Sequence, residues 1–152
     1  MAFRTLRQNE QLENPIVVDN SVMMRWLFHD GSEADQSYAR QVLSAIGSQN
    51  LQIIVPYIWV YEAAFVVQRY SKQNEMAYEQ YKTQLTWLFE LSLVIRGEEV
   101  PARLYEFSYR YGLSAYDAAY VMLALKQSCP LATLDQTIIK ISDKANYTLF
   151  EL

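Results

Sequence analysis

The chain has 152 residues, of which 51% are hydrophobic and 20% are charged, and this is the size and composition of a single folded domain. Its formal net charge of −4 argues against a protein that coats nucleic acid through bulk positive charge, but not against a nuclease whose metal ions supply local positive charge. The single cysteine, Cys129, excludes an intrachain disulfide and fits a reducing compartment, and the single histidine, His29, excludes a zinc site built on several His and Cys ligands.

The sequence shows no targeting or membrane-spanning segment. Residues 1–14 are polar and lack the apolar core of a signal peptide. The longest apolar stretch, residues 53–67, contains Pro56 and Glu62 and is shorter than the ~18 residues of a membrane span. We therefore expect a soluble cytoplasmic protein with no membrane partner, built from a polar extension (1–14) and one domain (15–152).

Short apolar segments alternate with amphipathic helical patterns along the chain. The predicted strands are 16–19, 51–55, 91–95 and 131–134, with a further edge strand at 147–150. The predicted helices are 23–28, a helix capped by Ser32 that stops at Gly47, 57–70, 74–90, one from Pro101 to Gly112, one from Ser114 to about 127, and 136–145. This alternation indicates an α/β fold, in which a parallel sheet is sandwiched by helices.

Four carboxylates lie at the ends of predicted strands or within predicted helices where the neighbouring residues are apolar. Asp19 and Asp135 directly follow predicted strands, Asp117 opens an apolar helix, and Glu62 interrupts the apolar residues of another. Ligands of such folds bind outside the carboxyl ends of the strands, so we expect these side chains to converge there. Clustered carboxylates repel one another and need a cation, for which hard oxygen ligands select Mg²⁺ or Mn²⁺.

Each carboxylate also has a purely structural alternative. Asp19 and Asp135 could cap the helices that follow them, because Asp is a favoured N-cap residue. Ser114 and Asp117 have the spacing of a capping box. Glu62 could pair with Arg69 or accept a tyrosine hydroxyl.

The aromatic and basic residues give weaker signals. The 12 tyrosines and three tryptophans could stack on bases, but most fall on apolar stripes, which favours core packing. Arg25, Arg69 and Lys72 could contact phosphates, although solvated helix faces explain them almost as well.

Four segments in order resemble the motifs of PIN-domain proteins. Val17 to Val22 is similar to the V-x-D-x-S opening of that family, and Val55-Pro56 followed by Trp59 to Glu62 is similar to its second motif. Leu113 to Ala119 resembles the third motif, and Leu131 to Asp135 resembles the fourth. The resemblance covers residues 16–150, and the closest branch is that of the VapC toxins of toxin–antitoxin pairs.

The resemblance implies a PIN fold and Mg²⁺- or Mn²⁺-dependent cleavage of RNA. It assigns metal binding and catalysis to four residues: Asp19, Glu62, Asp117 and Asp135. It gives Ser21 and Thr133 the role of supporting hydroxyls. The alternative is a PIN-like module that binds RNA or a protein without cleavage, which the presence of all four acids disfavours.

The same resemblance implies partners: an RNA substrate, a small VapB-like antitoxin and a second copy of the chain in a homodimer. We expect an amphipathic antitoxin segment in an apolar groove near residues 34–46 and 57–70, where Tyr38, Tyr57 and Trp59 supply aromatic surface. A basic side chain of that segment would reach the acidic pocket. The alternative is that these aromatic residues all lie in the core.

Overall fold

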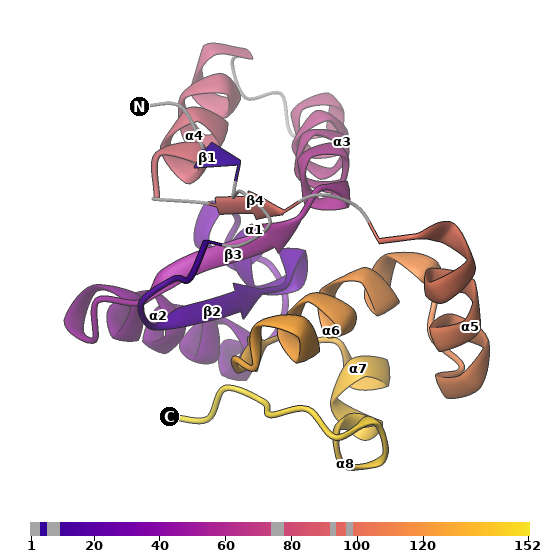
Figure 1. The fold of residues 1–152 in the computed structure, drawn as a ribbon. Coiled ribbons are helices and arrows are strands. Elements are labelled where there is room, and N and C mark those ends of the chain that lie inside the picture. The colour runs from indigo at the N-terminus through magenta and orange to yellow at the C-terminus, as the bar shows by residue number, and fades with distance from the viewer. Residues whose placement is uncertain (1–3, 6–9, 74–77, 92–93, 97–98) are drawn as a thin grey trace.

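A five-stranded parallel sheet, in the order β1-β4-β3-β2-β5, forms the centre of the molecule (Figure 1). The computed structural model describes residues 4–5, 10–73, 78–91, 94–96 and 99–152. The strands are β1 (Arg4–Thr5), β2 (Pro15–Val18), β3 (Gln52–Pro56), β4 (Val94–Arg96) and β5 (Leu131–Ala132). The predicted α/β class and parallel sheet are thus confirmed.

The strands differ from the prediction at the edges of the sheet and at the start of β4. β1 lies in the stretch predicted only as a polar extension, and it pairs with β4 in parallel. The predicted edge strand at 147–150 is reduced to one bridge between Leu131 and Leu149. The predicted third strand began at 91, whereas β4 begins at Val94; residues 92–93 lie outside the described residues.

Eight helices are found in the described residues. They are α1 (Asn20–Leu27), α2 (Glu33–Ser48), α3 (Ile58–Gln73), α4 (Tyr78–Glu90), α5 (Pro101–Tyr111), α6 (Ala115–Gln127), α7 (Gln136–Lys140) and α8 (Ser142–Ala145). The start predicted for α4 falls on residues 74–77, which lie outside the described residues. The capping box of Ser32 and Asp35 is confirmed at the start of α2. The single helix predicted for 136–145 is wrong, because the backbone changes conformation at Ile141 and divides it in two.

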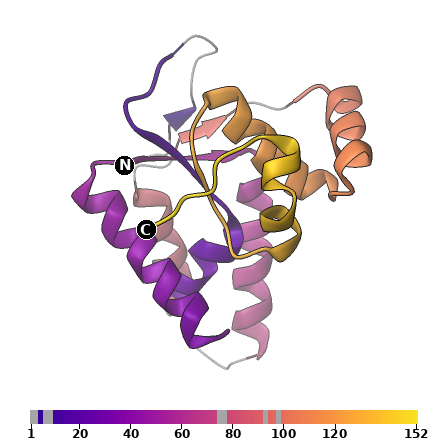
Figure 2. The same ribbon diagram turned by 90° about the horizontal axis from the view of Figure 1, so that it is seen from below.

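Helices cover both faces of the sheet. α6 lies in front of β2 and β3 in Figure 1, and α1 and α2 lie behind them; Figure 2 shows α2 and α6 on opposite sides of β2. The residues between these layers are fully buried and apolar, including Val17, Ile54, Leu131 and Val121. Because all strands run in one direction, β2, β3 and β5 end at the same edge of the sheet.

The aromatic residues are less buried than their pattern predicts. Six of the 12 tyrosines are exposed: Tyr57, Tyr61, Tyr78, Tyr105, Tyr109 and Tyr116. Conversely, Trp59 is fully buried and packs edge-on against Phe89, so its predicted place in an exposed groove is wrong. Across the described residues, every helix is too short or too polar to cross a membrane.

Candidate active site

Asp19 lies at the carboxyl end of β2 and is buried, with only 6% of its surface exposed. It occupies the N-cap position of α1, but its side chain makes no capping hydrogen bond. Instead, its Oδ2 accepts hydrogen bonds from Ser21 Oγ at 2.7 Å and from Thr133 Oγ1 at 2.8 Å. Helix capping therefore does not explain why a carboxylate is buried here.

The two hydroxyls that bond to Asp19 are themselves oriented by the backbone. Ser21 Oγ accepts the backbone N–H of Leu134, and Thr133 Oγ1 accepts that of Asp135, both at 3.0 Å. Because an N–H already donates to each hydroxyl oxygen, each hydroxyl hydrogen is directed at the carboxylate. Donors aimed at an ionised carboxylate stabilise its charged form.

Glu62 lies in the second turn of α3. Its Oε2 accepts a hydrogen bond from the hydroxyl of Tyr120, and the two oxygens are 2.5 Å apart. Of its two structural alternatives, the tyrosine hydroxyl is the one observed. Arg69 instead lies over the ring of Phe65, with its guanidinium carbon 5.7 Å from the ring centroid. Sequence analysis did not single out Tyr120, although it follows Asp117 by three residues and so shares its helix face.

Asp117 and Asp135 both take part in helix capping. The Ser114 hydroxyl accepts the backbone N–H of Asp117 at 3.0 Å and donates to its Oδ2 at 2.8 Å. Asp135 Oδ1 accepts the backbone N–H groups of Thr137 at 2.7 Å and Ile138 at 3.3 Å. The structural alternative is thus present at both residues, and each bond fixes the direction of a carboxylate.

In each of the four carboxylates, these hydrogen bonds use one oxygen only. The bonded oxygens are Oδ2 of Asp19, Oε2 of Glu62, Oδ2 of Asp117 and Oδ1 of Asp135. Within the part of the chain that the structure describes, the second oxygen of each takes part in no hydrogen bond. Each side chain is therefore held by one oxygen and has another to offer to a cation.

Electrostatic repulsion links the four carboxylates. Burial raises the pKa of Asp19, the Ser21 and Thr133 hydroxyls lower it, and the charges of Asp117 and Asp135 raise it. Burial also raises the pKa of Asp117, against its bond with Ser114, and Asp135 adds repulsion. The four side chains thus share one electrostatic environment at the edge where β2 and β5 end.

Glu62 is a carboxylate that changes its charge near neutral pH. Its pKa is raised to about 7, because burial and, to a smaller extent, the charges of Asp19 and Asp117 raise it, while the Tyr120 hydroxyl lowers it. A cation near these groups would offset both the burial and the repulsion, because it favours the charged form of each carboxylate.

The carboxylates fit a magnesium or manganese site by chemistry but are not closed around one. Carboxylate oxygens are the donors that Mg²⁺ and Mn²⁺ take, and raised pKa values are expected where such donors cluster. Yet among the described residues no three His, Cys, Asp or Glu side chains form a group that could hold a metal ion. An ion bound here would keep several of its water ligands, as Mg²⁺ usually does in proteins.

The basic residues of the first helices differ in their exposure and in their ion pairs. Arg25 forms an ion pair with Asp30, with Nη1 and Oδ1 2.6 Å apart, and its side chain is only 16% exposed. Arg69 and Lys72 on α3 are exposed, as is His29. Of the three residues considered for phosphate contact, Arg69 and Lys72 are therefore exposed, whereas Arg25 is held in an ion pair.

Comparison with known proteins gives a consistent family assignment. The model of the PIN domain matches residues 16–144, which include all four carboxylates. The crystal structure of PAE2754 from Pyrobaculum aerophilum is similar in fold, with a TM-score of 0.66 and 16% sequence identity over 92% of this chain and 88% of that one. No curated protein sequence matches the chain significantly.

Proposed function

This chain belongs to the PIN-domain family, and we propose that it is a Mg²⁺- or Mn²⁺-dependent endoribonuclease, the toxin of a toxin–antitoxin pair. PIN domains are in general nucleases, and the proposal adds the metal, the RNA substrate and the biological role. The observation that carries it is Asp19, a buried carboxylate held by two oriented hydroxyls beside three further acids.

In this proposal Asp19, Glu62, Asp117 and Asp135 hold the ion through the oxygens that their hydrogen bonds leave open. Bound Mg²⁺ or Mn²⁺ supplies the activation of water and the neutralisation of charge that phosphodiester hydrolysis needs. The Ser21 and Thr133 hydroxyls keep Asp19 in one rotamer, and Tyr120 does the same for Glu62. In the ion-free protein the pKa of Glu62 is about 7, so ion binding near neutral pH competes with a proton on this carboxylate.

The proposed partners follow from the same site. An antitoxin arginine would pair with the clustered carboxylates, and the antitoxin's apolar segment would lie along α3 and the residue before it, where Tyr57, Tyr61 and Phe65 are exposed. These three residues follow one another at intervals of four and form one stripe, which replaces the surface first expected around Trp59. Such a toxin acts in the cytoplasm on RNA, and a homodimer is its expected assembly.

The test is cleavage of single-stranded RNA by the purified protein with Mn²⁺, with and without a chelator. We expect cleavage that the chelator abolishes and that Asp19→Asn reduces at least a hundredfold, because the substitution removes one ligand charge while keeping the shape. Asp143→Asn on α8 is the matched control, since Asp143 is exposed and lies outside the four carboxylates.

Two results would contradict the proposal. Equal cleavage by the wild type and by folded Asp19→Asn would place the activity elsewhere or in a contaminant. Binding of RNA without Mn²⁺-dependent cleavage would favour the non-cleaving module instead. The toxin role is tested separately by co-expression with the adjacent reading frame, and it is wrong if the neighbouring protein neither binds nor inhibits this one.

A further inference from the structure

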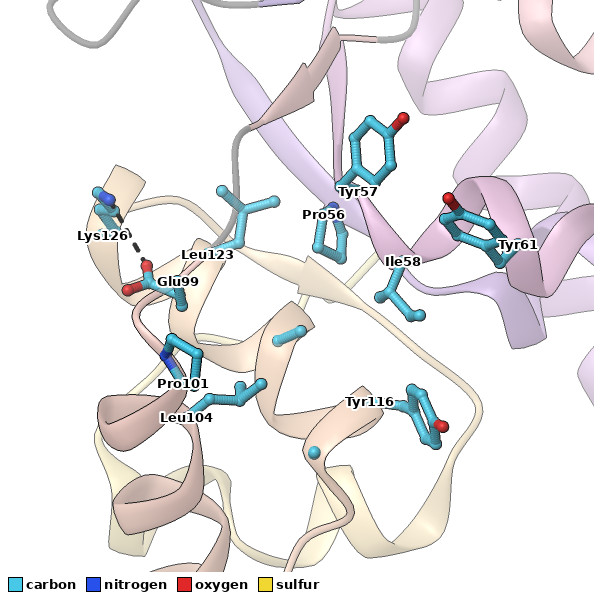
Figure 3. A pocket seen from close by; sticks show the side chains of 12 residues that line it. Pro56, Tyr57, Ile58, Tyr61, Glu99, Pro101, Leu104, Tyr116, Leu123 and Lys126 are labelled. Atoms are coloured by element: carbon cyan, nitrogen blue, oxygen red, sulfur yellow. Dashed lines mark ion pairs between the residues drawn. The ribbon is translucent and has the colours of Figure 1, made fainter.

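An apolar cavity of about 270 Å³ opens between the start of α3, α5 and α6, the helices α3 and α6 being those that carry Glu62 and Asp117 (Figure 3). Its walls include Pro56, Ile58, Leu104 and Leu123. We propose that this cavity receives one unpaired base of the RNA strand whose backbone lies at the acidic site. The inference rests on the proposed function and adds to it a base-binding subsite.

The position of the cavity is set by residues next to the acids in sequence. Tyr61 directly precedes Glu62 on α3, and Tyr116 directly precedes Asp117 on α6; both tyrosines line the cavity. Consecutive residues of a helix point about 100° apart, so cavity and carboxylates lie on adjoining faces of the same two helices. A strand with a phosphate at the acids therefore has a neighbouring base within reach of the cavity.

The distribution of polar groups matches a base. A nucleobase has two apolar faces and a polar edge, and single-stranded RNA is recognised through such splayed bases. In Figure 3, Tyr61 and Tyr116 lie on one side of the cavity, and Lys126 and Glu99 lie on the opposite side, with Nζ and Oε1 3.5 Å apart. The ammonium donates and the carboxylate accepts, so this pair can satisfy a base edge.

Size and charge favour a base over a protein helix. The cavity is smaller than the ~300–1,000 Å³ of pockets that enclose drug-sized ligands, which suits one ring system and not a helix. A chain of net charge −4 gains little RNA affinity from the release of counterions. Stacking supplies affinity that does not depend on net charge, and Tyr61 and Tyr116 are 63% and 58% exposed.

The experiment measures RNA affinity with the RNA kept intact. A 12-nucleotide single-stranded RNA is chosen in which the wild type cuts one mapped bond, and its binding is followed by fluorescence anisotropy with Mn²⁺ in the Asp19→Asn background. Tyr61→Ala and Tyr116→Ala remove the aromatic surfaces, and Ala119→Phe fills the cavity from α6. Tyr109→Ala is the matched control, because Tyr109 is 81% exposed on α5 and does not line the cavity.

We expect each cavity substitution to raise the Kd by about tenfold, the range in which single base–aromatic stacks fall, and Tyr109→Ala to leave it unchanged. An abasic site at one position beside the mapped bond should cause a similar loss. That loss should not add to the loss from Tyr61→Ala, because both remove the same contact. Because the two tyrosines are exposed, their alanine variants report on the cavity even if Ala119→Phe fails to fold.

Three results would overturn the inference without removing the proposed function. Unchanged affinity in all folded cavity variants would overturn it while leaving the nuclease standing. If the loss of affinity from Tyr61→Ala adds to the loss from an abasic site at every position tested, the base is bound outside the cavity. A change of oligomeric state by sedimentation, in step with the loss of affinity, would make the cavity an interface between copies of this chain. Absence of Mn²⁺-dependent cleavage by the wild type would instead remove the proposed function, and this subsite with it.

Discussion

Thr133 and Asp19 join the ends of two neighbouring strands through a hydrogen bond of 2.8 Å from Thr133 Oγ1 to Asp19 Oδ2. The residues are 114 positions apart in the sequence. They meet because β2 and β5 pair in parallel with Val18 opposite Ala132, so that the next residue of each strand lies beside the other. The register of the sheet thus fixes the geometry around the most buried carboxylate.

Thr133→Val should destabilise the protein without changing its fold. The substitution keeps the shape of the side chain but removes a buried hydroxyl that donates to Asp19 and accepts from Asp135 N–H. We expect the free energy of unfolding to fall by about 1–3 kcal/mol, because buried partners are left without a bond. Urea unfolding at pH 7 measures it. Thr83→Val on the exposed face of α4 is the control, and equal effects of both would show that the Thr133 hydroxyl contributes nothing.

Tyr120→Phe should lower the free energy of unfolding more at pH 8 than at pH 5.5. At pH 8 the Tyr120 hydroxyl donates to an ionised Glu62, a bond worth about 1.5–3 kcal/mol, whereas a bond to the neutral acid is worth about 0.5–1.5 kcal/mol. The free energy of unfolding of wild type and variant, measured at both pH values, gives the two differences. Tyr109→Phe should change neither, since Tyr109 is exposed; a loss independent of pH would argue against the bond to the charged form.

The parallel sheet and the placement of Asp19 and Asp135 were predictable from the sequence. Both residues follow short apolar runs, and strands buried on both faces must be apolar throughout. β1 was not predictable, because Arg4–Thr5 carries no periodic signal and becomes a strand only by pairing with β4. The division of the last helix at Ile141 was hidden for a related reason, since the apolar spacing continues across it.

The partners of the carboxylates were harder to predict than the carboxylates themselves. Tyr120 lies 58 positions from Glu62, and only the packing of α6 against the sheet brings its hydroxyl there. The exposure of Tyr61 and Tyr116 was also missed, because an apolar stripe cannot tell a core face from a face that lines an open cavity. Helix periodicity gives the side of a helix, whereas the neighbour that covers it comes from the tertiary fold.

Glu62→Gln should flatten the dependence of stability on pH. The pKa of Glu62 is about 7 in the folded protein, against the usual 4.5 of a glutamate. A raised pKa means that this group's stabilisation is fully present below pH 4.5 and is lost as the pH rises through 7. We therefore expect the wild type to lose stability between pH 5 and pH 8 and Glu62→Gln to lose less of it.

The measurement for Glu62 is chemical unfolding at half-unit pH steps from 5 to 8. Asp19 and Asp117 also have raised pKa values, so any slope that they contribute to the Glu62→Gln profile has the same sign. Glu79→Gln on α4 is the control, because Glu79 is exposed, and it should keep the wild-type profile. Parallel profiles for the wild type and Glu62→Gln would contradict the raised pKa.

Mn²⁺ should raise the melting temperature of the wild type, and more so at pH 8 than at pH 5.5. An ion that binds the folded state alone stabilises it by mass action, by about 2.7 kcal/mol when its concentration is 100 times the Kd. Protons compete with the ion for the carboxylates, and the pKa of Glu62 near 7 places that competition between the two pH values. The pH at which the ion stabilises most is therefore the pH at which the ion-free protein is least stable.

Calorimetry with and without millimolar Mn²⁺ at both pH values tests this linkage. Asp117→Asn should lose most of the increase, because it removes one of the repelling charges that the ion offsets. In the ion-free protein the lost first-turn charge of α6, worth a few tenths to about 1 kcal/mol, and the relieved repulsion from Asp135 act in opposite directions, so the stability should change little. Asp143→Asn should keep the full increase. Binding of Mn²⁺ seen by titration, with no change in melting temperature at either pH, would show that the ion binds outside the four carboxylates or binds the unfolded chain equally well.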